Sequence, residues 1–233
     1  MIDPETLARP RTSPASRPLL GLTVLLVEDS RYASDALRLM CLRSGARLRR
    51  ADSLRAAERH LQVYRPSVLI VDPGLPDGSG LDLIARLSAA RPRIPVIFAM
   101  SGDPGLDGAA RQAGADGFLA KPLVRVAEFQ QAILRHLPPD RCPSGPYALS
   151  QEQIRPDRLA YRDDLEHVRA VLAARPGAAA LAYAAQFLKG VAQSAGDSGL
   201  AQAASGLTGH GAEAGLAHVV GLIEARLAER MAI

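Results

Sequence analysis

The chain has 233 residues, a formal net charge of +4, no tryptophan and an aromatic content of 4%. This length suffices for one domain of ordinary size and a smaller one, and both cores must be mostly aliphatic. No uninterrupted apolar run reaches the roughly 18 residues of a membrane-spanning helix, so we expect no membrane segment and no membrane partner. The two cysteines, Cys41 and Cys142, suggest free thiols in a reducing cytoplasm rather than a disulfide framework.

The excess of positive charge does not lie in the C-terminal part of the chain. Lysine and arginine outnumber aspartate and glutamate by 3 to 2 in residues 1–18 and by 16 to 12 in residues 19–138, but residues 139–233 carry 9 against 10. DNA binding needs a basic surface, and residues 139–233 show no helix-turn-helix pattern with a basic recognition helix. We therefore expect no nucleic-acid partner. A transcriptional regulator with an unrecognised DNA-binding C-terminal domain remains the alternative.

Residues 1–18 contain four prolines and lack the layout of a signal peptide, so we predict a disordered N-terminal segment. Residues 19–137 then alternate between short apolar runs and helical periodicity. The predicted strands are 23–27, 47–50, 67–71, 96–100 and 117–119, and the predicted helices are 31–43, 54–64, 80–90, 106–113 and 124–137.

Five strand-then-helix units predict an α/β fold, a doubly wound five-stranded parallel sheet with helices on both faces. The first, third and fourth strands are almost wholly apolar, as expected of central strands, and the Arg-rich second strand is typical of an edge. The fourth helix carries Gly108 and is flanked by Gly105 and Gly114. Because glycine costs about 1 kcal/mol per helical site relative to alanine, we expect this helix to fray.

Five prolines within residues 138–156 predict a linker. The Ala-rich remainder, residues 157–233, predicts a small all-α bundle of four antiparallel helices. The expected helices are 157–173, 178–195, 198–207 and 212–230. Since alanine contributes little apolar area, this domain is expected to be only marginally stable alone.

Polar residues stand where the predicted strands of the α/β domain end. They are Glu28, Asp29, Asp72, Ser101 and Lys121. The carboxyl ends of parallel strands meet at one edge of the sheet, where open α/β sheets build their sites. Three carboxylates and a lysine suit a hard divalent cation and a phosphoryl group, and Asp72 is the candidate phosphoacceptor. Both Asp29 and Ser30 are also placed to cap the helix that starts at residue 31.

These residues, with the motif DPGLPDGSG after the third strand and with Phe118 and Pro122, resemble the receiver domain of bacterial two-component response regulators. The resemblance covers residues 21–137. It implies that Mg²⁺ is held by the carboxylates of Asp29 and Asp72 and the backbone carbonyl of Gly74, with Glu28 acting through water. It also implies that Asp72 attacks the phosphohistidine of a kinase and forms an acyl phosphate.

The same resemblance assigns roles to the remaining residues. Lys121 neutralises the phosphoryl oxygens, the backbone N–H groups of Gly74 and Gly102 donate to them, and the Ser101 hydroxyl binds the phosphoryl group. Phe118 occupies the aromatic switch position. One extra residue separates Pro95 from the serine, which leaves Met100 or Ala99 as alternative occupants of the serine position. Pro73 follows the acceptor directly and removes only an N–H that the site does not use.

The stretch AAQFLKG is similar to the active helix of histidine phosphotransfer (Hpt) domains, which carry a histidine two residues before LKG. Leu188, Lys189 and Gly190 match, but Gln186 stands in place of the histidine. A carboxamide is not a substitute for a nucleophilic imidazole, so the resemblance implies a degenerate Hpt domain. A plain dimerisation bundle is the structural alternative. His210 and His218 are more simply solvated or capping residues than substitute phosphoacceptors.

The sequence therefore predicts a phosphorylatable response regulator that is not itself an enzyme and signals through protein–protein interaction. The expected partners are a histidine kinase or Hpt protein, and either another receiver or its own receiver through the C-terminal bundle.

Overall fold

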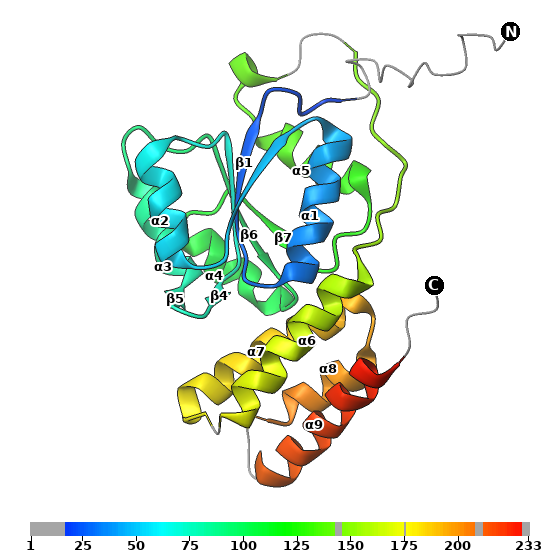
Figure 1. Ribbon diagram of the computed structural model, residues 1–233. Helices are drawn as coiled ribbons and strands as arrows, with labels where there is room; N and C mark the ends of the chain where they lie inside the picture. Colours follow the sequence, from blue (N-terminus) through cyan, green and yellow to red (C-terminus); the bar gives the residue numbers. More distant parts are fainter. Residues whose placement is uncertain (1–16, 143–145, 175, 208–211, 230–233) are drawn as a thin grey trace, which may run out of the picture.

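The computed structural model describes residues 17–142, 146–174, 176–207 and 212–229. An α/β domain is followed by a bundle of helices, which lies against the end of the sheet at which helix α1 starts (Figure 1). Among the described residues, no helix is long and apolar enough to cross a membrane.

The sheet has five parallel strands in the order β2-β1-β3-β6-β7. They are β1 (Thr23–Val27), β2 (Arg47–Ala51), β3 (Val68–Val71), β6 (Val96–Ser101) and β7 (Gly117–Ala120). This confirms the doubly wound parallel sheet. It also confirms that the first, third and fourth predicted strands are central, since β1, β3 and β6 lie between the Arg-rich edge strand β2 and the opposite edge strand β7.

Helices cover both faces of the sheet. The face packed by α1 (Arg31–Ser44) and α5 (Val126–His136) takes one set of alternating strand residues, such as Val24 and Leu26. The other face takes Leu25 and Val27 and is packed by α2 (Leu54–Val63), α3 (Gly80–Ala89) and α4 (Asp107–Gln112). Because successive strand residues point to opposite faces, one apolar strand supplies both cores.

The loop after Asp72 contains a small hairpin that the sequence did not predict. Its strands are β4 (Gly74–Leu75) and β5 (Gly78–Ser79). The turn residue Asp77 accepts hydrogen bonds from the backbone N–H groups of Leu54 and Arg55 at the start of α2, at 2.8 and 3.0 Å. The hairpin is thus fixed to a neighbouring helix, which restrains the loop that carries the candidate phosphoacceptor.

Two segments outside the predicted sheet and helices also pack on the α/β domain. Residues 17–21 form a turn in which Pro18 and Leu19 are buried, and residues 1–16 of the predicted disordered segment lie outside the described residues. Within the predicted linker, Ile154 is buried in the core beside α1 and α5, and its N–H donates to the carbonyl of Val124. The described part of the linker after residue 145 is therefore docked on the domain.

The C-terminal helices are α6 (Arg158–Ala173), α7 (Ala178–Ala195), α8 (Ser198–Ser205) and α9 (Ala212–Ala228). They enclose an aliphatic core that includes Leu165, Leu188 and Ile223. Asp197 ties three of them together, because it caps α8 at Leu200 and accepts from Tyr161 and Arg226. The helical fold expected of this part is confirmed, and the predicted helix end at Arg230 and His210 lie outside the described residues.

Two glycines provide a matched stability test of the α/β domain. A Cβ atom at Gly80 would overlap with the backbone carbonyl of Asp72, whereas Gly108 on the exposed face of the six-residue helix α4 has nothing within 4 Å of that position. We expect Gly80→Ala to lower the free energy of unfolding by about 2 kcal/mol, and Gly108→Ala to raise it by up to about 1 kcal/mol. Urea unfolding followed by circular dichroism measures both, and equal stability of the two variants would contradict this packing.

Candidate functional site

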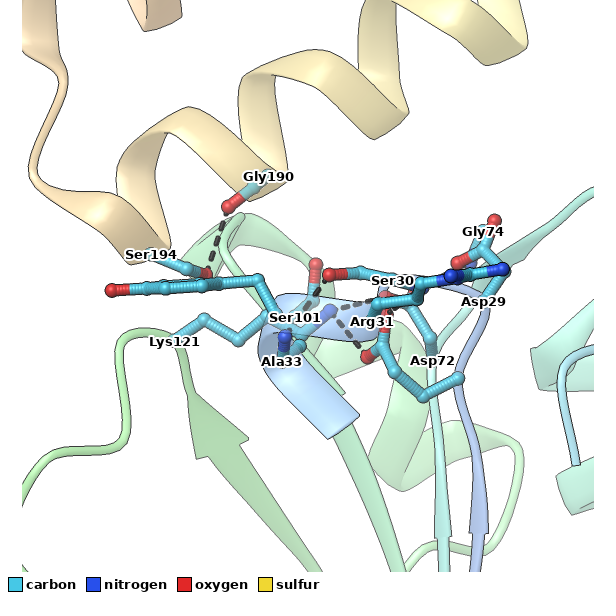
Figure 2. A network of polar contacts seen from close by, with 12 residues as sticks. Asp29, Ser30, Arg31, Ala33, Asp72, Gly74, Ser101, Lys121, Gly190 and Ser194 are labelled. Carbon is cyan, nitrogen blue, oxygen red and sulfur yellow. Dashed lines mark hydrogen bonds and ion pairs between the residues drawn. The ribbon is translucent and has the colours of Figure 1, made fainter. Parts of the chain in front are cut away.

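The five polar residues predicted at strand ends come together at one edge of the sheet. Glu28 and Asp29 follow β1, Asp72 follows β3, Ser101 ends β6 and Lys121 follows β7. Figure 2 shows four of these residues beside the first turn of α1, below the helix that carries Gly190 and Ser194; they are Asp29, Asp72, Ser101 and Lys121. The parallel sheet therefore places them as the sequence predicts.

Lys121 is at the centre of a buried ion cluster. Its Nζ lies 2.5 Å from Asp72 Oδ2 and 2.6 Å from Glu28 Oε2. The side chains of Lys121 and Glu28 are 7% and 1% exposed. Burial alone would lower the pKa of Lys121, but the carboxylates of Asp72 and Glu28 outweigh it and raise that pKa above its usual range. The lysine is therefore held in its charged form.

One lysine does not compensate the carboxylates around it. Burial raises the pKa of Glu28 to about 8 and that of Asp29 to about 6. Glu28, Asp29 and Asp72 each offer a carboxylate oxygen, and these oxygens lie within 4.8 Å of one another. A hard divalent cation prefers such oxygen ligands, so the donor set fits Mg²⁺.

The Ser101 side chain belongs to the site. It is buried, lines the same cavity as Asp72 and Lys121, and its hydroxyl accepts from the N–H of Asp103 at 3.1 Å. The extra residue before it is absorbed by the strand, because Met100 and Ala99 lie in the two cores on either side of the sheet. Neither of them takes the place of the serine.

Three other residues of the predicted site lie close by. The Gly74 N–H donates to Asp72 Oδ1 at 2.7 Å, so this amide holds the acceptor carboxylate itself. Gly102 lines the cavity beside Ser101. Phe118 is half-buried on β7 and packs against the core that contains α2, α3 and α4. Of the two candidate caps of α1, it is Ser30 whose hydroxyl accepts from the N–H of Ala33.

The C-terminal bundle covers this site. Helix α7 and the strand ends enclose a cavity of about 100 Å³. Gln186, Gly190 and Gln193 are four and three residues apart, so they share one face of α7, and all three line the cavity together with Lys189. A Cβ atom at Gly74 would overlap with the carboxamide of Gln186, and one at Gly102 would approach that of Gln193. Glycine at these two positions makes room for the helix.

A buried aspartate of the bundle anchors it to the start of α1. Asp164 of α6 accepts from the Ser30 hydroxyl at 2.7 Å and from the N–H groups of Arg31 and Tyr32 at 2.8 and 3.0 Å. A carboxylate is stabilised at a helix N-terminus by the free N–H groups and the helix dipole. In addition, the Tyr183 hydroxyl of α7 donates to Asp29 Oδ2 at 2.5 Å. One bundle residue thus touches the acidic cluster directly.

These contacts include residues that the sequence did not single out, namely Asp164, Tyr183 and Gln193. A signal existed for Asp164, because it lies four residues before the buried Val168 and so falls on the apolar face of its helix. A charged residue at such a position needs a partner. The sequence did not indicate that the partner belongs to another domain.

Neighbouring aspartates of α6 allow a matched test of this anchor. In Asp164→Ala we expect the amides of Arg31 and Tyr32 to exchange at least about tenfold faster, because each loses a hydrogen bond to a charged acceptor. In Asp163→Ala we expect changes within about twofold, since its ion pair with Arg31 is exposed. Amide exchange measured by NMR distinguishes the two variants, and unchanged exchange in Asp164→Ala would show that this carboxylate is not the anchor.

Known proteins share the N-terminal half of this chain. Residues 24–134 match the family model of the response regulator receiver domain. The virulence transcriptional regulatory protein PhoP of Salmonella typhimurium strain LT2 is 32% identical over 117 residues, which cover 49% of this chain and 52% of PhoP. PhoP of Escherichia coli O157:H7 is 30% identical over the same share. The chain spans about half the length of these relatives.

Solved structures match the same half of the chain. A receiver domain of a sensor histidine kinase from Pseudomonas aeruginosa, with magnesium in its active site cleft, is 28% identical. The match covers 50% of this chain and 97% of that one, with a TM-score of 0.45. A response regulator from Chloroflexus aurantiacus is 29% identical over 49% of this chain and 92% of its own, with a TM-score of 0.43. On the family match and the strand order, residues 24–134 are a response regulator receiver domain.

Proposed function

We propose that this protein is a response regulator that accepts a phosphoryl group on Asp72 from a phosphohistidine of a histidine kinase or phosphotransfer protein. The observation that carries the proposal is the ion pair of Lys121 with Asp72 inside a cluster of three carboxylates at the floor of a cavity. A carboxylate held beside a fixed ammonium group is positioned for nucleophilic attack on phosphorus. The ammonium group also offsets charge on the transferred oxygens.

The remaining residues of the site fit the same chemistry. Glu28, Asp29, Asp72 and the carbonyl of Gly74 would hold Mg²⁺, which supplies positive charge beside the phosphoryl oxygens when it is bound. The Ser101 hydroxyl and the N–H groups of Gly74 and Gly102 would donate to those oxygens. Since the N–H of Gly74 already donates to Asp72, it holds the nucleophile before transfer.

The position of the bundle supports a role as the output module. Phosphorylation replaces the single negative charge of the Asp72 carboxylate with a phosphoryl group that carries about −1.5 to −2. The added charge lies in a small cavity under α7, beside carboxylates that are already poorly compensated. This addition shifts the docking equilibrium of α7 toward release from the strand ends, while a fraction of the phosphorylated molecules keeps α7 docked. The face of the bundle that is buried against the receiver would then be free for another protein, such as a kinase or a second receiver domain.

The degenerate Hpt interpretation of the bundle gains support from the place of Gln186. This residue stands where the resemblance puts the phosphoacceptor histidine, and it lies at the rim of the cavity that contains Asp72. An Hpt histidine must approach a receiver aspartate in the same way for phosphoryl transfer. Lys189, the lysine of the LKG motif, lines the same cavity.

A transcriptional role is the second candidate function, because the relatives named above are transcriptional regulatory proteins. The match to them covers the receiver domain alone, and residues 139–233 of this chain carry slightly more acidic than basic residues. Salt-sensitive binding of the full chain to duplex DNA would favour this candidate over an output by protein–protein interaction.

The phosphoacceptor is tested with a small-molecule donor. When the full chain is incubated with Mg²⁺ and acetyl phosphate, we expect the intact mass to increase by one phosphoryl group. The increase should be absent in Asp72→Asn, which lacks the nucleophilic carboxylate, and present in the control Asp82→Asn on the exposed face of α3. An unmodified wild type, or an adduct that persists in Asp72→Asn, would refute the assignment.

The Hpt-like geometry is tested by introducing a nucleophile at position 186. In Gln186→His we expect part of the phosphate to move from Asp72 to the introduced imidazole. It then becomes stable to alkali, which cleaves acyl phosphates but not phosphohistidine. The exposed residue Gln202 of α8 provides the control, since in Gln202→His all phosphate should stay sensitive to alkali. If all phosphate on Gln186→His also stays sensitive to alkali, the result would argue against an Hpt-like approach of α7 to Asp72.

A further inference from the structure

The Gln186 carboxamide is aimed at the receiver site but does not take part in docking. The hydrogen bonds between described residues of α1, the strand ends and the bundle run through Asp157, Asp163, Asp164 and Tyr183, and Gln186 is in none of them. Its amide nevertheless packs against Gly74, whose N–H holds the Asp72 carboxylate. This placement beside the acceptor residue, without a docking hydrogen bond among the described residues, leaves the carboxamide available to bind a solvent molecule.

We infer that Gln186 orients a water molecule for hydrolysis of the phosphoryl group on Asp72, so that the bundle acts as a phosphatase toward its own receiver domain. The inference rests on the proposed phosphorylation of Asp72. A glutamine carboxamide suits this task because its oxygen accepts a hydrogen bond from water while its N–H₂ group donates one. Glutamine orients the attacking water in other phosphoryl-transfer sites.

The space at the site fits a phosphoryl group and a water molecule together. The cavity measures about 100 Å³, which corresponds to roughly three waters at about 30 Å³ each. Gln186 is an exposed residue at its rim, so solvent reaches the amide. Gly74 lacks a side chain on the surface that faces Gln186, which lets the carboxamide come close to the acceptor residue.

The reaction is balanced with water as the only co-reactant. The water oxygen forms a bond to phosphorus, the bond between phosphorus and the Asp72 oxygen breaks, and its electron pair returns to the carboxylate. A proton of the water passes to a phosphoryl oxygen, so inorganic phosphate leaves. The carboxamide takes no proton and only orients the water. Lys121 and the N–H of Gly74 already hold the Asp72 carboxylate that is released, which stabilises the leaving group.

The test follows the lifetime of the phosphoryl group on the full chain. The protein is loaded with acetyl phosphate and Mg²⁺ and desalted rapidly, and the decay of the added mass is measured. In Gln186→Met, which keeps the length of the side chain without its amide, we expect decay at least about fivefold slower than in the wild type. Gln202→Met on the exposed face of α8 is the control and should decay at the wild-type rate.

Two further measurements separate catalysis from docking. The amides of Arg31 and Tyr32, which donate to Asp164 of α6, should exchange at wild-type rates in unphosphorylated Gln186→Met, which shows that the bundle remains docked. Asp164→Ala, which weakens docking and leaves Gln186 intact, should also slow the decay, because the carboxamide then spends less time at the site. Decay at or above the wild-type rate in this variant would overturn the inference.

The outcomes also distinguish this inference from the function on which it rests. If the phosphoryl group is lost equally fast from Gln186→Met and the wild type, the inference alone is overturned. The same holds if Gln193→Met loses it slowly and Gln186→Met loses it at the wild-type rate. The absence of any adduct on the wild type would overturn the proposed function and this inference with it.

Discussion

The buried ion cluster around Lys121 is the constraint on which the site depends. A single ammonium group serves Asp72 and Glu28, and burial leaves the pKa values of Glu28 and Asp29 well above their usual range. A group that adds or removes charge here therefore changes the protonation of these carboxylates, and with it the stability of the folded site. The Tyr183 hydroxyl already donates to Asp29. A cation held by Asp29 would compete with that hydroxyl for the same carboxylate, which would link occupancy of the site to docking of the bundle.

Chain connectivity strengthens this link. Asp29 ends the acidic pair after β1, and the next three residues, Ser30, Arg31 and Tyr32, are those that Asp164 binds. The bundle therefore does not dock on a remote surface of the receiver. It caps the helix that begins at the site, and a small shift of the loop after β1 displaces three hydrogen bonds at once. Coupling between site and bundle needs no long pathway, since both depend on the same four residues.

Local patterns were enough to predict the receiver domain and most of its site. Alternating apolar runs located all five strands, and the polar residues at their ends meet because parallel strands share one carboxyl edge. The hairpin of Gly74 and Ser79 was missed because its two-residue strands carry no periodicity. The contacts of Asp164 and Tyr183 were missed for another reason. They join residues more than 130 positions apart, and a single sequence contains no spacing rule for a contact between domains.

Under the proposed Hpt resemblance, Gln186 would stand in place of a catalytic histidine and still provide chemistry at the site. Replacing an imidazole by a carboxamide abolishes nucleophilic attack, because the amide nitrogen has no available lone pair. The same replacement keeps a side chain of similar reach that both donates and accepts hydrogen bonds. On a helix held over an acyl phosphate, these properties favour water as the nucleophile instead of the protein. On this proposal, a helix that positions a phosphoryl acceptor needs only one substitution to position a hydrolytic water, and the docking contacts of Asp164 and Tyr183 do not involve that residue.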